Sequence, residues 1–444
     1  MISKGLPGFR DFPPEDLALR THIFRVWREV AARYGFEEYD GPPLEPLDLY
    51  TGKSGDEIVA QLYTFSDKGD RQVALRPEMT PTLARMVAAR ANGLKKPLRW
   101  FSIPQLFRYE RQQRGRLREH FQLNCDLIGE AGPLADAEII ALAIDMMRGF
   151  GFGPQDVRVR VSDRRVLTDI LVRRGVPEQE LNDAFQVIDK AERLSKGDIK
   201  SFSVNDPIKF GPQSMNGLLD VSRIRGMDQV QSELKGSDSR GLRSLEATIS
   251  ALDALGLREW IDVDMAIVRG LAYYTGTVFE LFDAKRSLRA ICGGGRYDTL
   301  LDSLGGADLP ALGFGMGDVV LGELLKDRGL HPPVNPAIDV FVASVTAEDV
   351  PDVLRLAHEL RDAGIRVEYA LSHSAVGKQL NLANARGARL AVVIGPDDRA
   401  RAEVQLKDLG GKSQESVARS DIAMILGTRL TSHLSPLATQ DPNG

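Results

Sequence analysis

A dense group of arginines lies in the stretch RYERQQRGRLREHFQ, residues 108–122. Apolar segments border it on both sides, WFSIPQLF before it and LNCDLIG after it, and this pattern predicts two strands joined by an arginine-rich hairpin loop. Guanidinium groups bind phosphate oxygens through paired N–H bonds. The stretch therefore predicts a polyphosphate site, although a solvated charged face would have the same composition.

Side chains on both strands of this hairpin are candidates for binding. Arg108 ends the incoming strand and Arg116 follows the turn, so the two could bind an inner and a terminal phosphate. Glu110 could accept a hydrogen bond from an exocyclic amine. Gln122 and Asp126 lie four residues apart on the outgoing strand, and strand alternation sends both to one face. Polar groups buried there require either a ligand or a structural hydrogen-bond network.

Two further segments carry suitable side chains. In RPEMT, Glu78 and Thr80 follow a proline and could hold an ammonium group, or Thr80 could cap the next helix. In RGLAYYTG, Arg269 directly follows the apolar strand MAIV. Beside Tyr273 and Tyr274 it could bring charge to a pocket with an aromatic wall. An exposed strand end is the simpler interpretation.

Glycines, cysteines and histidines limit other chemistry. GGGRYD, residues 293–298, lacks the GKT or GKS of a P-loop. Its Gly293 and Gly295 are predicted to allow close backbone approach, here to a flat ligand such as adenine. Cys125 and Cys292 are far apart in apolar surroundings, which predicts inert core residues. The histidines form no HxxxH or HExxH pair, so no zinc site is expected.

The spacing of apolar residues predicts the elements that position these segments. HIFRVWREVAARYGF has helical spacing and a stop at Gly35. Helical, charged sequence separates the hairpin from the later strand and glycine segments, which favours an antiparallel sheet completed late in the chain. After the proline-flanked joint HPPVNP, strands alternate with helices as in a compact α/β domain. The expected divisions are 1–163 and 260–330 for one interrupted domain, 164–259 for a helical insertion, and 337–430 for the C-terminal domain.

The composition excludes several classes of protein. The chain has 444 residues, 43% of them hydrophobic and 27% charged, which describes a globular protein of two or three domains. No apolar run reaches the length of a membrane span, and the N-terminus MISKGLPGFRDF has no apolar signal core. A cytoplasmic location without membrane attachment is therefore expected. The net charge of −5 argues against a general nucleic-acid coat but permits a local basic surface.

Taken together, these segments resemble the histidyl-tRNA synthetase family of class II aminoacyl-tRNA synthetases over nearly the whole chain. The helix ending YGFEEYDGPPLE is similar to motif 1, with Pro42 at the dimer-interface proline, and RPEMT is similar to the histidine-pocket element. FRYERQQRGRLREHFQLNCDLIG resembles motif 2, and RGLAYYTGTVFE, followed by GGGRYD, resembles the family's own signature. The resemblance implies an α+β fold: a class II antiparallel sheet flanked by helices, a helical insertion and a C-terminal α/β anticodon-binding domain.

The resemblance also implies roles for the candidate residues. The implied histidine pocket comprises Glu78, Thr80, Gln122, Asp126, Tyr273 and Tyr274, with Asp126 at the position that reads the imidazole. The implied ATP site comprises Arg108, Glu110, Arg116, Gly293 and Gly295. Arg108 and Arg269 would be the catalytic pair on either side of the α-phosphate. Candidate RNA contacts in the C-terminal domain are Lys378, Arg386 and Arg389.

The implied activity is that of a histidine–tRNA ligase, a homodimer that joins histidine to tRNA-His with ATP and Mg²⁺. A carboxylate that attacks an α-phosphate needs fixed positive charge rather than a protein nucleophile, so the implied site agrees with the absence of a catalytic triad. Ala272 stands at an aspartate of the family signature, Gln112 at a motif 2 proline, and Val320 at the motif 3 arginine. One lost guanidinium would weaken binding by about 1–3 kcal/mol.

These departures favour an alternative. Val320 and Ala272 would suit a non-catalytic, synthetase-like regulatory subunit that senses histidine as a partner of ATP phosphoribosyltransferase. The retained pair Arg108 and Arg269 opposes this alternative, as does the C-terminal domain, which such subunits usually lack. The ligase is the preferred hypothesis.

Overall fold

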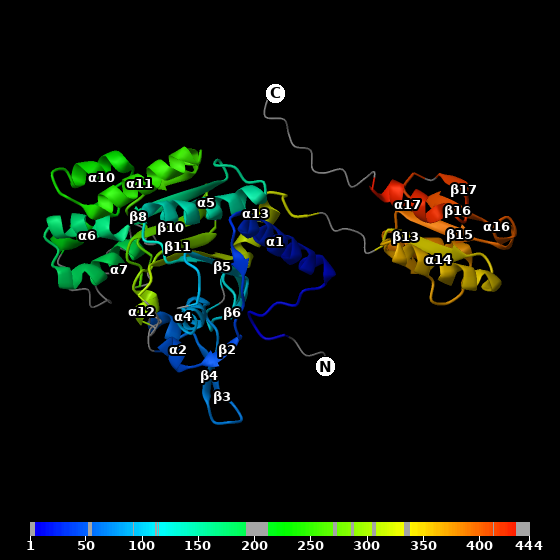
Figure 1. The fold of residues 1–444 in the computed structure, drawn as a ribbon, viewed down its shortest axis with the longest axis horizontal. Coiled ribbons are helices and arrows are strands. Elements are labelled where there is room, and N and C mark those ends of the chain that lie inside the picture. The colour runs from blue at the N-terminus through cyan, green and yellow to red at the C-terminus, as the bar shows by residue number, and fades with distance from the viewer. Residues whose placement is uncertain are drawn as a thin grey trace. The chain divides into compact units, whose positions relative to one another are not determined.

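The structure is a computed structural model that describes residues 5–51, 56–91, 93–111, 113, 115–191, 212–269, 273–285, 288–303, 308–332, 338–411 and 413–431. The sequence positions Gln112, Ala272 and Pro336 lie outside these residues. The chain divides into two units, residues 1–332 and 333–444 (Figure 1). Each unit is described by itself.

A sheet of nine described strands forms the centre of the first unit. All neighbours on the main path are antiparallel except the end pairs β1 with β5 and β8 with β9, which are parallel. In order across the sheet, the strands are β1 (Glu37–Glu38), β5 (Leu98–Ser102), β7 (Glu119–Ile128), β12 (Ala311–Gly317), β11 (Cys292–Arg296), β10 (Thr277–Asp283), β8 (Val157–Asp163) and β9 (Ile261–Val263), with β6 (Gln105–Phe107) paired to β7. Strands from the end of the unit therefore lie between β7 and β8. This arrangement confirms the predicted sheet that is completed late in the chain.

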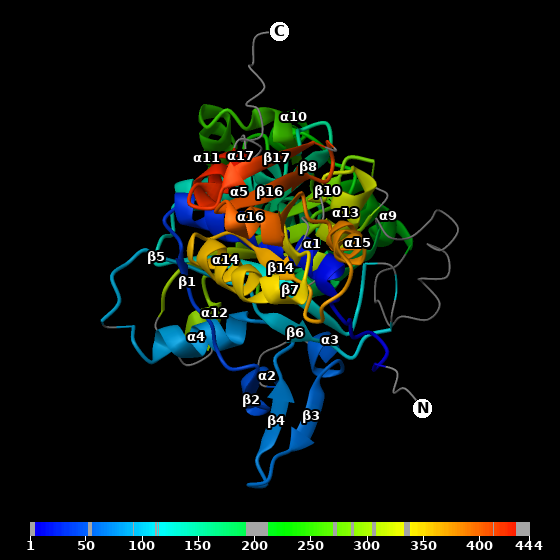
Figure 2. The same ribbon diagram turned by 90° about the vertical axis from the view of Figure 1, so that its right-hand side faces the viewer.

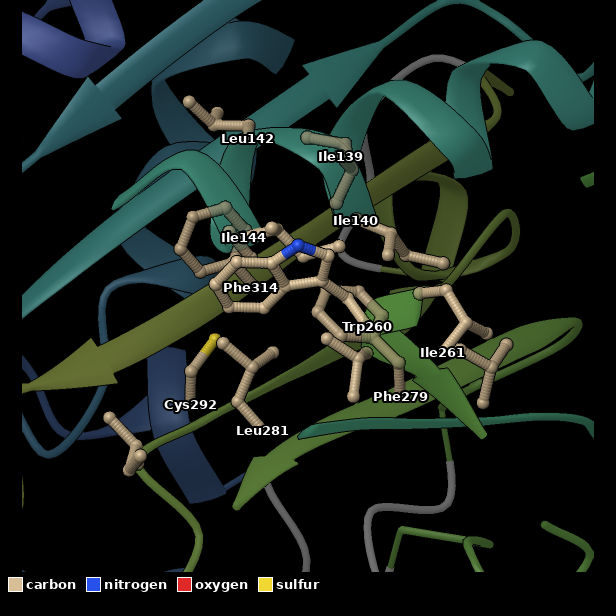
Figure 3. Packing of buried hydrophobic residues seen from close by; sticks show 14 of the residues in the cluster. Ile139, Ile140, Leu142, Ile144, Trp260, Ile261, Phe279, Leu281, Cys292 and Phe314 are labelled. Atoms are coloured by element: carbon tan, nitrogen blue, oxygen red, sulfur yellow. The ribbon is translucent and has the colours of Figure 1, made fainter. Parts of the chain in front are cut away.

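Alternation along the strands gives the sheet two different faces. Leu123, Cys125 and Leu127 of β7 are buried in the main hydrophobic cluster, whereas the residues between them face the other side. Figure 3 shows the apolar face, where side chains of β10, β11 and β12 pack against helix α5 (Pro133–Gly149). Both cysteines are buried and unpaired, and burial raises the pKa of each thiol, so the prediction of inert core residues is confirmed.

Helix α5 lies on the apolar face, and α1 (Pro14–Arg33) and α11 (Arg240–Ala254) pack against it (Figure 1). Helix α13 (Asp318–Asp327) packs on α1 and β7. The buried stripe of α1 contains Ile23, Val26, Trp27 and Val30. The chain leaves this helix at Gly35, where φ is 71°, a conformation that favours glycine. The predicted helix and its end are therefore confirmed.

The remaining elements of this unit surround the sheet. A three-stranded sheet, β2 (Leu44–Pro46), β4 (Gln72–Leu75) and β3 (Tyr63–Ser66), projects from the unit as a hairpin in both views (Figures 1 and 2). Short helices near it are α2 (Asp48–Thr51), α3 (Asp56–Val59), α4 (Thr80–Ala88) and α12 (Leu300–Ser303). The described part of the predicted insertion is helical throughout: α6 (Arg164–Arg173), η1 (Glu178–Glu180), α7 (Leu181–Ala191), α9 (Pro212–Val221), α10 (Met227–Glu233), α11 and η2 (Arg258–Trp260).

The second unit is the predicted α/β domain. Its five-stranded sheet has the order β14 (Val367–Tyr369), β13 (Val340–Ser344), β15 (Leu390–Ile394), β16 (Glu403–Asp408) and β17 (Gln414–Ala418). The first three strands are parallel and the last two are antiparallel. The helices are η3 (Ala347–Asp349), α14 (Val350–Asp362), α15 (Val376–Ala385), α16 (Pro396–Ala400) and α17 (Ile422–Thr431). Of the three predicted RNA contacts, Lys378 and Arg386 are exposed and Arg389 is half-buried.

Arg296, inside GGGRYD, connects β11 to the start of α5. Its Nε and Nη2 lie 3.1 Å and 2.9 Å from the Asp136 carboxylate, and both side chains are almost fully buried. Replacing Arg296 by Met should destabilise the first unit by about 3–5 kcal/mol, because Asp136 would remain as a buried, unpaired charge. Urea unfolding of this unit measures the change.

Two controls test this explanation. The double variant Arg296→Met with Asp136→Asn should recover much of the loss, because no buried charge is left unpaired. Arg25→Ala, which removes only exposed contacts on α1, to Glu29 and His22, should change the free energy of unfolding by less than about 1 kcal/mol. Equal losses in the single and double Arg296 variants would contradict the role of the pair.

Candidate active site

All predicted histidine- and ATP-site residues except Gly295 line one cavity of about 920 Å³ in the first unit. Residues of β7, β10, β11 and β12 contribute to its lining, together with the loop between β6 and β7. We call residues 108–118 the arginine loop. The lining contains the predicted residues Glu78, Thr80, Arg108, Glu110, Arg116, Gln122, Asp126, Arg269, Tyr273, Tyr274 and Gly293. Side chains from three distant parts of the sequence therefore share one cavity.

The arginine loop presents its charges from a short turn. Arg108 Nε donates to the carbonyl oxygen of Pro77 at 2.9 Å, which orients the guanidinium. At the tip, Gln113 and Arg116 form an isolated β-bridge, with backbone N···O distances of 3.2 Å and 2.9 Å. Arg116 Nε lies 2.9 Å from Glu110 Oε2. Two of the predicted ATP-binding side chains therefore pair with each other.

Arg269 reaches the cavity from the end of a buried segment. Its Nη1 lies 2.6 Å from Glu280 Oε1 on β10, and its guanidinium lies 5.8 Å from the ring centroid of Tyr274. Burial acts to lower the pKa of Arg269, but Tyr274 and Glu280 hold it above the ordinary value, so the charge is permanent. The backbone of Arg269 has φ 59°, a conformation that costs about 1–3 kcal/mol in a residue other than glycine.

Glycines on two central strands make room for the site side chains. A Cβ at Gly293 would overlap the guanidinium of Arg269, and a Cβ at Gly313 or Gly315 of β12 would overlap Asp126 or Gln122. Gly295 is not part of the cavity lining, because the ring of Tyr274 packs over it, 2.9 Å from where a Cβ would lie. The close approach to the glycine backbone of residues 293–295 is thus made by side chains of the protein, those of Arg269 and Tyr274. The predicted approach of adenine to Gly295 is not supported by this position.

Strand β7 contributes four consecutive residues of one face to the cavity: His120, Gln122, Asn124 and Asp126. Gln122 Nε2 donates to Asn124 Oδ1 at 2.8 Å. Burial and the nearby charge of Arg108 lower the pKa of His120 to about 3, so the imidazole is neutral. Sequence reasoning placed Gln122 and Asp126 on this face but missed His120 and Asn124, although the same alternation predicts them.

Asp126 lies at the buried end of this row. The hydroxyl of Tyr297, from GGGRYD, donates to Asp126 Oδ1. Burial raises the pKa of Asp126 to about 7, and the Tyr297 hydrogen bond opposes that rise. A carboxylate buried in this way needs hydrogen-bonding partners to compensate its burial, and Tyr297 is one of them. Tyr297 was not among the predicted residues, since its role depends on β11 and β7 being separated only by β12.

Glu78 and Thr80 line the cavity beside an aromatic cluster. Helix α4 begins at Thr80, and its described N-terminus has no side-chain capping hydrogen bond, so the capping interpretation of Thr80 is wrong. The ring centroids of Tyr273 and Tyr274 lie 4.9 Å apart, and those of Tyr273 and Tyr297 lie 5.9 Å apart. A buried carboxylate, a hydroxyl and aromatic rings suit a small cation with an apolar body.

Helix α13 brings an apolar surface to the cavity. Val320 is 9% exposed and lines it, and a Cβ at Gly115 of the arginine loop would lie 3.2 Å from Val320 Cγ2. Asp318, at the start of the helix, instead binds Arg10 at 2.8 Å and accepts from the backbone of Phe121 at 2.9 Å. The first turn of α13 therefore places an apolar side chain beside the arginine loop and supplies no cation there.

Comparisons with known proteins show the family of the chain. A family model described as "Histidyl-tRNA synthetase" matches residues 8–317, and one described as "Anticodon binding domain" matches residues 339–429. A histidine–tRNA ligase from Opitutus terrae is 45% identical over 426 residues, which cover 94% of this chain and 97% of that protein. The chain belongs to the histidyl-tRNA synthetase family. The resemblance inferred from the sequence is thereby confirmed.

Other members of the histidyl-tRNA synthetase family are similar over comparable lengths. The chloroplastic/mitochondrial histidine–tRNA ligase of Arabidopsis thaliana is 40% identical over 415 residues, which cover 94% of this chain and 85% of that protein. The crystal structure of histidyl-tRNA synthetase from Nostoc sp. PCC 7120 has a TM-score of 0.80 and 28% identity and covers 97% of this chain and 99% of that chain. The predicted α+β fold class and the predicted enzyme class, an aminoacyl-tRNA ligase, are confirmed. The regulatory-subunit alternative has no better support.

No group of three or more His, Cys, Asp or Glu side chains is arranged to hold a metal ion within the described ranges. In the same part of the chain, every helix is too short or too polar to cross a membrane.

Proposed function

We propose that the chain is a histidine–tRNA ligase that forms histidyl-adenylate from histidine and ATP and transfers the histidyl group to the 3′ end of tRNA-His. One observation carries the proposal: Arg108 and Arg269, from distant parts of the sequence, line the same cavity. Both are permanent cations. They are the groups needed where a carboxylate attacks an α-phosphate, since two anions must approach each other.

The first step is a displacement at phosphorus. A carboxylate oxygen of histidine forms a bond to the α-phosphorus of ATP, and the bond from this phosphorus to the bridging oxygen of pyrophosphate breaks. Pyrophosphate leaves with the electron pair. Negative charge grows on the phosphoryl and bridging oxygens, and Arg108 and Arg269 stabilise it. Neither residue gains or loses a proton in this step.

Histidine is held by the buried part of the cavity. Glu78 and Thr80 bind its amino group, Asp126 accepts from an imidazole N–H, and the remaining contacts come from Gln122, Tyr273 and Tyr274. Glycines at 313 and 315 give Asp126 and Gln122 the room they need. This assignment places the only titratable group of the substrate side chain against a carboxylate whose pKa is about 7.

ATP occupies the part of the cavity beside the arginine loop. Glu110 accepts from the adenine amine, Arg116 binds the outer phosphates, and Gly293 lies beneath the guanidinium of Arg269. ATP binds as its magnesium complex, in which the ion is carried by the phosphates and supplies further positive charge to them. The pair Glu110 and Arg116 separates when ATP arrives, because each then has a ligand partner.

In the second step a ribose hydroxyl at the tRNA end attacks the carbonyl carbon of the adenylate. The new ester bond forms, AMP leaves, and the hydroxyl proton is released. The C-terminal unit binds the anticodon, with Lys378, Arg386 and Arg389 as contacts. The proposal includes a homodimer and a cytoplasmic location, as expected from the sequence.

The proposal is tested with purified protein, ³²P-labelled pyrophosphate and a tRNA-His transcript. We expect exchange of label into ATP that depends on histidine, and charging of tRNA-His but not of a tRNA for another amino acid. Protein that binds histidine in calorimetry but catalyses no exchange would contradict the ligase and favour the regulatory subunit. Exchange that another amino acid supports equally would contradict the assigned specificity.

A further inference from the structure

The connection between β10 and β11 brings a further arginine to the ATP end of the cavity. Its described residues Leu288, Arg289 and Ala290 all line the cavity. Arg289 Nη2 donates to the side-chain carbonyl of Gln113. A hydrogen bond thus joins this connection to the tip of the arginine loop, although the two segments are far apart in sequence.

Gln113 links Arg289 to the predicted phosphate-binding residue. Backbone hydrogen bonds pair Gln113 with Arg116 at the loop tip, so Arg289 and Arg116 flank the same turn. Arg116 is paired with Glu110 at this turn, whereas Arg289 contacts it through the neutral Gln113 amide. An anionic ligand at this point can therefore gain contacts with both guanidinium groups.

The start of helix α13 explains why a cation is needed from the connection between β10 and β11. Val320 presents methyl groups to Gly115, and Asp318 is directed to Arg10, so the start of α13 gives the phosphates no positive charge. Arg269 and Arg108 belong to the reacting phosphorus in the proposed function. The charge at the outer phosphates must then come from the arginine loop and from the segment bonded to it.

We propose that Arg289 is an ATP-binding residue that contacts the outer phosphates together with Arg116 and holds the arginine loop over them. The assignment rests on the proposed function. It also accounts for activity in a chain that has Val320 in place of an arginine, because the guanidinium enters from the β10–β11 connection instead of from α13. A guanidinium has five N–H donors, so one group can bond both the Gln113 amide and a phosphate.

Arg289→Ala should raise the KM for ATP in histidine-dependent exchange by roughly tenfold to a hundredfold, the effect of losing a hydrogen bond to a charged group. The KM for pyrophosphate should rise similarly when the reaction is run in reverse, whereas the KM for histidine and the inhibition constant of AMP should stay unchanged. AMP lacks the outer phosphates and therefore separates contact with them from contact with adenosine. Arg289→Lys should restore part of the ATP affinity, since it keeps the charge but not the fork of donors.

Lys285→Ala is the matched control, because Lys285 is an exposed cation on the same connection that does not line the cavity. It should leave every constant unchanged, and the thermal unfolding of all three variants should match that of wild type. Equal weakening of ATP and AMP binding by Arg289→Ala, or no change in the KM for ATP, would overturn the assignment while wild-type exchange persists. Absence of exchange in the wild type would instead contradict the proposed function itself.

Discussion

Arg269→Ala is expected to lower histidine-dependent ATP–pyrophosphate exchange by about 10²–10³-fold, as removal of one preorganised donor to a transition-state oxyanion does. Most of the loss should appear in kcat, because charge grows on the phosphoryl oxygens only as the new bond forms. The variant also leaves Glu280 without its 2.6 Å partner, so a carboxylate would face the phosphates. Glu280→Gln in the same chain should recover part of the activity by removing that repulsion.

Arg99→Ala is the matched control for Arg269. Arg99 forms a half-buried pair of similar geometry, 2.7 Å from Glu138, but it does not line the cavity. Its removal should change the exchange rate less than twofold, because the pair does not reach the cavity. The free energy of unfolding should fall by no more than about 1 kcal/mol, as expected for the loss of a partly exposed ion pair. An Arg269→Ala enzyme with near wild-type kcat would show that one guanidinium is sufficient at the phosphorus and would refute the paired arrangement.

Asp126→Asn is expected to raise the KM for histidine by about tenfold to a hundredfold, because an ionised acceptor of the imidazole N–H becomes a neutral one. Asparagine has nearly the same shape, and Tyr297 can still donate to its carbonyl oxygen. The change therefore tests charge rather than packing. The KM for ATP should be unaffected, because the proposed ATP site lies at the other end of the cavity, beside the arginine loop.

The same variant tests the pH dependence of the site. Burial raises the pKa of Asp126 from an ordinary value of 3.8 to about 7, so the folded state binds this proton more tightly than the unfolded state. The contribution of Asp126 to stability is therefore present at low pH and is lost as the pH rises from about 4 through 7. Relative to Asp126→Asn, ligand-free wild type should become easier to unfold over that interval. If the free energy of unfolding changed with pH in the same way in both proteins, the raised pKa of Asp126 would be contradicted.

Histidine affinity should show the opposite trend. In the proposed site the ionised form of Asp126 accepts from the imidazole, so the ratio of wild-type to Asp126→Asn affinity should rise with pH through about 7. The ratio cancels the titration of free histidine, which is common to both measurements. In Tyr297→Phe the midpoint should move to higher pH, because the hydrogen bond that opposes the raised pKa is lost. Calorimetric titration at several pH values gives these ratios.

Local patterns predicted much of the candidate site. Period-two alternation places Gln122 and Asp126 on one face of a strand, and the same rule would have added Asn124 between them and His120 before them. The arginine loop could be predicted because charge between two apolar strands is a local signal. The helix ending at Gly35 follows from spacing and from a glycine stop in the same way.

The order of the strands in the sheet could not be predicted from local sequence patterns. Tyr297 reaches Asp126, and Arg289 reaches Gln113, only because β10, β11 and β12 are inserted into the sheet next to β7. No spacing rule relates residues more than a hundred positions apart. The glycines of β11 were predicted to let a ligand approach the backbone. The side chains of Arg269 and Tyr274 pack there instead, and their position depends on the path of the segment before β10.

Two arginines of the cavity are paired with carboxylates of the same cavity: Arg116 with Glu110, and Arg269 with Glu280. A single phosphate or sulfate ion would have to displace an internal carboxylate at each guanidinium and could replace only one of these contacts at a time. A nucleotide that spans the whole cavity can replace both ion-pair contacts at the same time. The self-paired state should therefore keep cellular inorganic anions from competing, so that occupancy follows the supply of ATP rather than the supply of free phosphate.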